Sequence, residues 1–328
     1  MKTRQFNSTQ LHVSEIGLGT WQIGGSWGVV SESEGMKILH AAIECGVTFF
    51  DTADVYGDGK SERLIGNFIK TTHPKDLFVA TKLGRSSTPG WPGNFTLSAM
   101  RAHANESLKR LGVDALDLTQ LHCVPIEILR HGEIFHNLRT LKGEGKIKQF
   151  GASVESMEEA LICLEEDGLA SLQIIFNIFR QKPITTLFKT AHEKGVAIIV
   201  RLPLASGLLT GKMTLETKFT KTDHRNFNRD GESFNVGETF AGLPYEKGVE
   251  LADELKALVP KGMTMAQMAL RWVLDYEAVT TIIPGASKAS QITSNVLSSD
   301  FAPLSPALHD KLTKWYEAKV AKNIRGPY

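Results

Sequence analysis

The stretch Phe49-Phe50-Asp51-Thr52-Ala53-Asp54-Val55-Tyr56-Gly57 is the most informative part of this chain. A short apolar run ends on an acid, and a tyrosine follows five residues later beside a glycine. The run predicts a strand that delivers Asp51 to its carboxyl end, with Tyr56 presented by the turn that follows. A tyrosine hydroxyl has a pKa of about 10 in water, and a nearby cation lowers that value by favouring the phenolate. The motif therefore directs attention to any cation at a neighbouring strand end.

Two later strand-like runs supply such neighbours. One is followed directly by Lys82, and the next ends on His122. Each residue has a structural alternative: Asp51 could cap a turn, Lys82 could be a solvated lysine, and His122 could be a core histidine. Their placement on successive strands around Tyr56 favours a catalytic site over all of these alternatives.

Strand-like and helix-like runs alternate through most of the sequence, a rhythm typical of a (β/α)8 barrel. The expected strands are Ile16–Leu18, Thr48–Asp51, Leu77–Thr81, Ala115–His122, Ile147–Gly151, Leu172–Phe176, Val196–Val200 and Thr280–Ile283. The amphipathic stretches between them are Ser33–Cys45, Leu97–Leu111, Ile126–Leu141, Ser156–Leu164 and Ile184–Lys194. Helix ends are expected at Gly46, Gly112 and Gly195, and Ser156 with Glu159 fits a capping box. We predict an α/β fold, a TIM barrel, with residues 1–328 as a single domain.

A doubly wound sheet is the alternative architecture. Its dinucleotide fingerprint is missing, because Gly17 and Gly19 are followed by Gln22 where a third glycine is needed. Ahead of the first strand, Arg4–Phe6 and Leu11–Val13 flank the polar turn Asn7-Ser8-Thr9. This pattern predicts a hairpin that closes the barrel floor.

Two long insertions interrupt the alternation of strands and helices. They are Arg85–Phe95 and Met213–Pro244, and each follows a strand's carboxyl end. Long loops in a compact domain are commonly functional or mobile, so we expect a substrate wall and a cofactor flap at the C-terminal face. Decoration without a function is the alternative for both.

Composition excludes several classes of protein. The chain has 328 residues, 42% hydrophobic and 22% charged, with a net charge of +1, so nothing in it favours nucleic acid or a membrane surface. No apolar run approaches the roughly 18 residues of a spanning helix, and the first residues lack the apolar core of a signal peptide. Cys45, Cys123 and Cys163 form no disulfide pattern, which favours a reducing, cytoplasmic setting.

The four residue types suit the reduction of a carbonyl group. Negative charge builds on the carbonyl oxygen as hydride arrives at carbon, and Tyr56 can supply the proton. Lys82 would lower the pKa of the phenol, and Asp51 would hold Lys82 charged and oriented. His122 would donate a hydrogen bond to the carbonyl oxygen.

The chain resembles the aldo-keto reductase family over nearly all of its length. The segments that carry the resemblance are Gly17-Leu18-Gly19-Thr20-Trp21, Asp51–Tyr56, Ala80-Thr81-Lys82 and Leu121-His122. The resemblance implies that Asp51, Tyr56, Lys82 and His122 are the family's catalytic tetrad. It also implies reduction of aldehydes or ketones with NADPH, generally without a metal, with the cofactor extended across the barrel mouth.

The resemblance also implies a set of cofactor-binding residues. They are Gly19, Thr20, Trp21, Asp51, Ser153, Gln173, Arg201, Pro203, Leu204, Ser206, Gly207, Leu208, Lys212, Gly285, Ser287, Lys288, Gln291 and Asn295. Ser287 and Lys288 would meet the 2′-phosphate at a helix start, and Gln291 and Asn295 would face the adenine. Val154, Phe176 and Arg201 depart from the family's residues at their positions. We expect the Arg201 guanidinium to stack or to bind phosphate in place of an aromatic ring.

Trp21, Tyr56, Trp91 and His122 are the expected substrate-binding residues, with Phe95 beside them. The expected substrate is a small carbonyl compound or a sugar. One competing function is a cofactor-binding regulatory subunit, because potassium-channel β subunits belong to the same family. A barrel metal hydrolase is the other, and the scattered histidines, which form no His-x-His pair, disfavour it.

Overall fold

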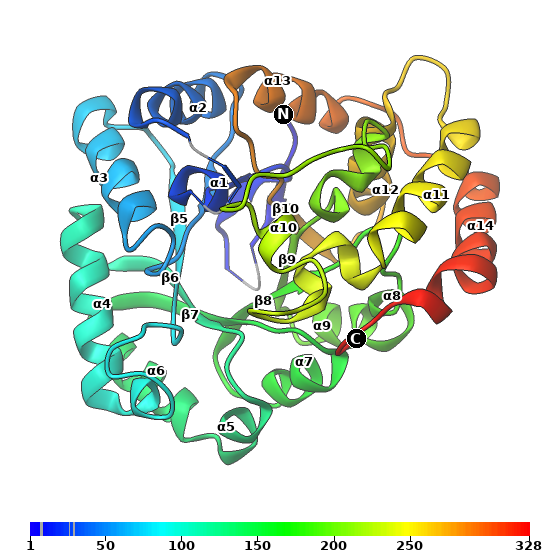
Figure 1. The fold of residues 1–328 in the computed structure, drawn as a ribbon. Coiled ribbons are helices and arrows are strands. Elements are labelled where there is room, and N and C mark those ends of the chain that lie inside the picture. Colours follow the sequence, from blue (N-terminus) through cyan, green and yellow to red (C-terminus); the bar gives the residue numbers. More distant parts are fainter. Residues whose placement is uncertain (7–8, 26, 29) are drawn as a thin grey trace.

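Eight parallel strands form one sheet in which each strand pairs with the next along the chain (Figure 1). The computed structural model describes residues 1–6, 9–25, 27–28 and 30–328. The strands are β3 (Leu18–Gly19), β4 (Phe49–Asp51), β5 (Phe78–Leu83), β6 (Leu116–His122), β7 (Ile147–Ser153), β8 (Leu169–Ile175), β9 (Ala197–Arg201) and β10 (Val279–Ile282). Parallel bridges from Ile16 to Ile282 and from Gly19 to Gly285 join the first strand to the last. The predicted (β/α)8 barrel is therefore confirmed.

The helices surround the barrel and bury their apolar faces against the strands (Figure 1). The helices before the fifth strand of the barrel are α1 (Trp21–Gly24), α2 (Glu32–Glu44), α3 (Lys60–Thr72), α4 (Leu97–Leu111), α5 (Ile126–His131) and α6 (Glu133–Gly143). Those that follow it are α7 (Met157–Leu164), α8 (Pro183–Thr186), α9 (Phe188–Glu193), α10 (His224–Phe227), α11 (Tyr245–Leu255), α12 (Met265–Leu274), α13 (Ala289–Val296) and α14 (Pro306–Trp315). Among the described residues, no helix has both the length and the apolarity needed to cross a membrane.

Several helix ends lie where local sequence patterns predict them. Gly46, Gly112 and Gly195 have φ values of 80°, 68° and 64°, the left-handed conformation expected after a helix. The predicted capping box is present, because the Ser156 side chain accepts from Glu159 N while the Glu159 carboxylate accepts from Ser156 N. These positions agree with the prediction because each depends only on a few neighbouring residues.

Two predicted helices are broken in the structure. The stretch Ile126–Leu141 divides into α5 and α6 at Gly132, whose φ of 72° is incompatible with a continuous helix. The stretch Ile184–Lys194 divides into α8 and α9 at Leu187, where φ is −125°. Both breaks preserve an apolar face on each half, so periodicity alone did not reveal them.

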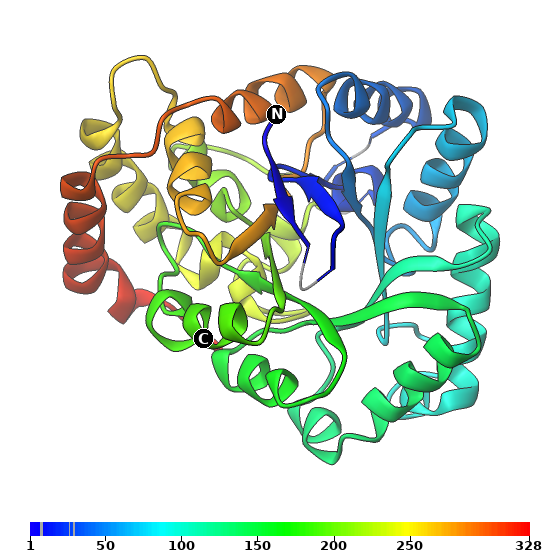
Figure 2. The same ribbon diagram turned by 180° about the vertical axis from the view of Figure 1, so that it is seen from behind.

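The hairpin at the floor consists of β1 (Thr3–Gln5) and β2 (His12–Ser14), paired antiparallel, and it lies across the barrel end seen in Figure 2. Phe6 is fully buried, with its ring centroid 5.1 Å from that of Phe78 and 6.1 Å from that of Phe49. The hairpin therefore plugs the floor as predicted, and the opening for ligands lies at the other end. Residues 7 and 8 of the predicted turn lie outside the described residues.

Both insertions follow strands that end at the open mouth. Arg85–Phe95 ends in a short 3-10 helix, Gly93–Phe95. Met213–Pro244 contains α10 and the two short turns Val236–Glu238 and Phe240–Gly242. Its arrangement depends on tertiary contacts described below.

Candidate active site

Asp51 and Lys82 form a buried ion pair at the carboxyl ends of adjacent strands. Lys82 Nζ lies 2.5 Å from Asp51 Oδ1 and donates a second bond to the Thr52 carbonyl oxygen at 2.9 Å. Both side chains are almost completely buried. Burial alone lowers the pKa of Lys82, but the negative charges of Asp51 and the Tyr56 phenolate outweigh it, and the net pKa is raised. Lys82 therefore stays an ammonium group at the base of the site.

The second carboxylate oxygen of Asp51 is held from the far side of the barrel. Gln173 Nε2 donates to Asp51 Oδ2 at 2.7 Å, and Gln120 Nε2 donates to the same oxygen at 3.2 Å. Asp51 is thus fixed by three strands besides its own. The sequence analysis missed Gln120, although a polar residue in a buried strand, two positions before His122, was a usable signal.

Tyr56 is presented by the turn after β4, as predicted. Its hydroxyl lies 3.3 Å from Lys82 Nζ. Its ring stacks against that of Trp21, with centroids 6.0 Å apart and an interplanar angle of 18°. Gly57 follows at φ 61°, and a Cβ there would approach the Gly24 carbonyl oxygen to 2.2 Å. Only glycine fits this position, so Gly57 allows the turn to pack against α1 and fixes the ring of Tyr56.

The pKa of Tyr56 is raised above 10.0 overall, although Lys82 lowers it as expected from the sequence. Burial has the largest effect and raises the pKa, whereas the charge of Lys82 lowers it. Asp51 and Glu238 add negative charge that raises it further. Lys82 therefore limits the rise without reversing it, and Tyr56 is a protonated donor at neutral pH.

His122 faces Tyr56 from the end of β6. The two ring centroids lie 5.8 Å apart with an interplanar angle of 82°. Burial lowers the pKa of His122 well below its usual value, and the charges of Arg85, Lys82 and Arg201 lower it further. The buried Nδ1 has no hydrogen-bond partner among the described residues. The imidazole is thus neutral, and its ring lines the cavity described next.

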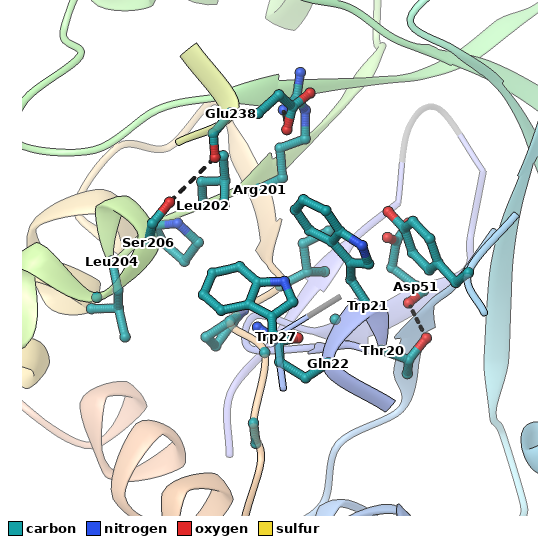
Figure 3. Close-up of a pocket in the computed structure, with 18 of the residues that line it drawn as sticks. Thr20, Trp21, Gln22, Trp27, Asp51, Arg201, Leu202, Leu204, Ser206 and Glu238 are labelled. Carbon is teal, nitrogen blue, oxygen red and sulfur yellow. Dashed lines mark hydrogen bonds and ion pairs between the residues drawn. The ribbon is translucent and has the colours of Figure 1, made fainter. Parts of the chain in front are cut away.

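Asp51, Tyr56 and His122 border a cavity of about 510 Å³ at the barrel mouth. Figure 3 shows this cavity with Asp51 at its wall. It extends along the surface to the segment from Ile283 to Gln291 and to the turn from Leu202 to Gly207. Thr20 Oγ1 anchors its wall by donating to the Asp51 carbonyl oxygen at 2.8 Å, which Figure 3 also shows. All the predicted site residues line this cavity except Lys82, Trp91, Phe95, Leu208, Lys288 and Asn295.

Arg201 is already bound within the protein. Its Nη1 lies 2.6 Å from Glu238 Oε2, and its Nη2 donates to the Val154 carbonyl oxygen at 2.9 Å. The guanidinium lines the cavity, but an ion pair fixes it to the second insertion. Glu238 thus already compensates the charge of Arg201, and the expected stacking or phosphate binding by this guanidinium stays a prediction. The sequence offered no signal for this partner 37 positions away.

The turn after β9 adopts an unusual backbone. Leu202, Ala205, Ser206 and Gly207 all have positive φ, at 52°, 48°, 55° and 102°. Such turns direct backbone N–H groups to one side and suit an anion. The Ser206 hydroxyl instead donates to the Glu238 carbonyl oxygen at 3.2 Å (Figure 3). It also accepts from Phe240 N at 3.1 Å. It therefore fastens the second insertion over the turn.

The start of α13 closes the far end of the cavity. The Gln291 side-chain oxygen accepts from Ser287 N at 2.8 Å and from Lys288 N at 3.2 Å. Gln291 is thus bonded to the helix start. Lys288 is exposed beside it, and Asn295 is buried one turn further on. Ser287 and Gln291 line the cavity, whereas Lys288 and Asn295 are not among its lining residues.

Trp91 lies away from the cavity, contrary to the predicted substrate contact. Its side chain is 52% exposed, and its indole nitrogen donates to the Gly84 carbonyl oxygen at 2.5 Å. Phe176, another departure from the family pattern, is fully buried against Trp272 and Phe188. Phe176 therefore packs within the protein, whereas Trp91 lies at its surface.

The structure adds cavity residues that the sequence analysis did not name. Trp27, Arg225, Phe234 and Glu238 line the cavity, and all but Trp27 come from the second insertion. Arg225 binds Asp223 through two nitrogens, at 2.9 and 2.6 Å, and its guanidinium lies 4.9 Å from the Trp27 ring centroid. An irregular loop has no periodicity that would place these side chains.

Comparisons with known proteins agree with this geometry. The model of the aldo/keto reductase family matches residues 15–317. The aldo-keto reductase YhdN of Bacillus subtilis (strain 168) is 32% identical over 303 residues, covering 89% of this chain and 87% of the relative. The NADH-specific methylglyoxal reductase of Escherichia coli (strain K12) is 28% identical over 313 residues, covering 90% and 93%. The solved holo form of aldo-keto reductase AKR11C1 from Bacillus halodurans superposes with a TM-score of 0.77, at 27% identity and 96% coverage of both chains.

Proposed function

The chain belongs to the aldo/keto reductase family of oxidoreductases, and from that premise we propose that it is an NADP(H)-dependent reductase of aldehyde, ketone or sugar carbonyls. The reaction is reversible, with Tyr56 as general acid in reduction and general base in oxidation. One observation carries the proposal. The Tyr56 hydroxyl lies 3.3 Å from the buried ammonium of Lys82, on a cavity that His122 also borders.

Tyr56 delivers the proton that the carbonyl oxygen needs. The raised pKa keeps this phenol protonated until the oxygen becomes basic. The Lys82 ammonium then stabilises the phenolate left behind, and Asp51 holds the ammonium in place. His122, neutral and partly unbonded, donates to the carbonyl oxygen and fixes its position.

The cavity has features that fit a nicotinamide dinucleotide. When bound, the reduced nicotinamide supplies the hydride. The positive-φ turn from Leu202 to Gly207 suits a pyrophosphate, with the cations of Lys212 and Arg225 on the same cavity. A Cβ at Gly285 would come within 1.9 Å of Gln22 Oε1, so the glycine leaves room for the Gln22 side chain in the cavity wall. Ser153 and Gln173 line the tetrad end of the cavity, where they would hold the nicotinamide.

Lys288 is proposed to favour NADPH over NADH. It is an exposed cation beside the start of α13, where a 2′-phosphate would lie next to Ser287. Family membership alone does not decide the cofactor, since the Escherichia coli relative is named for NADH. We expect Lys288→Gln to lower kcat/KM for NADPH by roughly tenfold and to leave NADH unchanged. Lys261→Gln, on an exposed turn elsewhere, is the control. A native preference for NADH would contradict this assignment.

A metal hydrolase is a poor alternative for the same cavity. Within the described chain, one group of ligand-type atoms lies within 4.8 Å, from Cys123, Glu155 and Glu238. Both carboxylates are already paired with guanidinium groups, Glu155 with Arg85 and Glu238 with Arg201. Two neighbouring cations oppose the binding of a third.

The proposed function is tested by following NADPH absorbance with the purified protein and a panel of aldehydes, ketones and sugars. Turnover of at least one class of carbonyl is expected. NADPH binding should be measured in parallel by quenching of tryptophan fluorescence. Tight binding without any turnover would contradict the enzyme assignment and favour the regulatory-subunit alternative.

A further inference from the structure

One end of the cavity is lined by charged groups that the proposed chemistry does not use. Arg85 follows β5, the strand that carries Lys82, and lines the cavity with Cys123 and the Arg201–Glu238 pair. Trp21, Trp27 and Phe234 contribute aromatic rings to the same cavity. Covering the charged part of the cavity with an apolar group costs desolvation free energy, because the guanidinium groups of Arg85 and Arg201 then lose water without gaining a partner.

The Arg85 guanidinium is rigidly held. Its Nε donates to the His122 carbonyl oxygen at 3.1 Å, and its Nη2 lies 2.9 Å from Glu155 Oε1. The side chain remains 23% exposed. In the described structure its Nη1 has no hydrogen-bond partner, so that nitrogen can donate to a ligand. These two hydrogen bonds keep Nη1 of Arg85 next to the backbone of His122.

We propose that Arg85 determines specificity by selecting substrates with an oxygen atom on the carbon next to the reacting carbonyl. The proposal rests on the reductase function proposed above. With the reacting oxygen between Tyr56 and His122, the neighbouring substituent is presented to the charged wall, where Nη1 donates to it. A site built to donate to an oxygen discriminates strongly against the analogue that lacks it, because the donor is then left buried without a partner.

The two ion pairs that line the cavity restrict the substrate class further. Glu155 neutralises Arg85 and Glu238 neutralises Arg201. A substrate carboxylate would therefore meet two existing carboxylates, whereas a neutral ketone or hydroxyl oxygen accepts from Nη1 without repulsion. The inferred class is neutral α-oxo and α-hydroxy carbonyl compounds.

The experiment compares three ketones with the same carbon skeleton: butane-2,3-dione, 3-hydroxybutan-2-one and butan-2-one. The kcat/KM of each is measured for the native enzyme and for Arg85→Met. The decisive quantity is the change caused by the substitution, because the greater intrinsic reactivity of the dione is common to both enzymes. We expect losses of about tenfold or more for the two oxygenated ketones and under about threefold for butan-2-one.

Three controls protect the interpretation. Arg85→Met/Glu155→Gln removes the unpaired carboxylate if the single variant is unstable, and it should show the same selectivity change. Arg101→Met removes a surface guanidinium paired with Glu144 outside the cavity and should change nothing. For the native enzyme, 2-oxobutanoate should be a poorer substrate than the dione.

The outcomes separate the two proposals. Equal losses on all three ketones would overturn the specificity role, since Arg85 would then act only by positioning His122. No loss on any ketone would overturn it as well. A native enzyme that reduces none of the carbonyls would defeat the reductase function, and the specificity proposal with it.

Discussion

Both ends of the barrel carry ion-paired side chains, but among the described residues the mouth also holds uncharged polar groups with few or no partners. At the floor, Arg4 donates to Glu15 at 2.9 Å and to the carbonyl oxygens of residues 274, 276 and 279. Glu15 also accepts from Ser299 at 2.8 Å. Asp275 binds Arg271 and His309, each at 2.8 Å. The polar atoms of this network are directed at one another.

At the mouth, a histidine and a tyrosine have few or no hydrogen-bond partners among the described residues. The Lys82–Asp51 pair is as well bonded as the floor network, but the groups above it are not. His122 Nδ1 is buried without a partner in the described chain, and the Tyr56 hydroxyl has only Lys82. Buried polar groups are normally satisfied, so orphaned groups around a cavity indicate where a ligand belongs. A network in which every polar group has a partner is thus structural, whereas one with unpartnered groups beside a cavity indicates a functional site.

The largest effect is expected where the two kinds of network meet, at Lys82. Lys82→Met leaves the buried Asp51 carboxylate without its cation, which we expect to cost about 3–5 kcal/mol in the free energy of unfolding. It also removes the charge that stabilises the Tyr56 phenolate, so kcat/KM should fall by about a hundredfold or more. Urea denaturation and NADPH oxidation measure the two effects.

The double variant Asp51→Asn/Lys82→Met separates them. It removes the uncompensated charge, so stability should recover in part while activity stays low. Recovery of activity together with stability would contradict a catalytic role for Lys82.

The floor should behave in the opposite way. Glu15→Gln leaves Arg4 and Arg271 with a weakened partner, and we expect a loss of about 3 kcal/mol in the free energy of unfolding. The kcat/KM of the folded enzyme should stay within about twofold of the native value. A large fall in kcat/KM at unchanged stability would contradict a purely structural role for the floor network.

A smaller, pH-dependent effect is expected at Asp54, close to Tyr56. Its Oδ1 is buried without a partner in the described residues, and burial, aided by the charge of Glu62, raises its pKa from 3.8 to about 7. The folded state therefore binds this proton more tightly than the unfolded chain does. The resulting stability is fully present below pH 3.8 and is lost as pH rises through about 7.

Asp54→Asn resembles the protonated form and should unfold less readily than the native protein at pH 8. The gain should be on the order of 2 kcal/mol and should disappear towards pH 4. Thermal melts across this pH range measure it. An equal change in stability at both pH values would contradict the assignment of the proton to Asp54.

The strand ends could be predicted from sequence because short apolar runs located them. Asp51, Lys82 and His122 each follow or end such a run, and parallel strands necessarily bring their carboxyl ends to one face. The breaks at Gly132 and Leu187 escaped prediction, because the apolar periodicity continues through both.

The second insertion could not be placed from sequence. The Glu238 side chain pairs with Arg201, and the Glu238 carbonyl oxygen accepts from the Ser206 hydroxyl. No local sequence pattern predicts either contact. The net direction of the Tyr56 pKa shift could not be predicted either. The sequence identified the cation but not the depth of burial, and burial has the larger effect.

The most direct test of the account is the substitution Tyr56→Phe, which removes one hydroxyl and keeps the ring that stacks on Trp21. NADPH oxidation with the best carbonyl substrate and NADPH binding by fluorescence are measured on the same preparation. The account predicts a loss of about a hundredfold or more in kcat/KM with cofactor affinity unchanged. Carbonyl reduction within a few-fold of the native rate would contradict it.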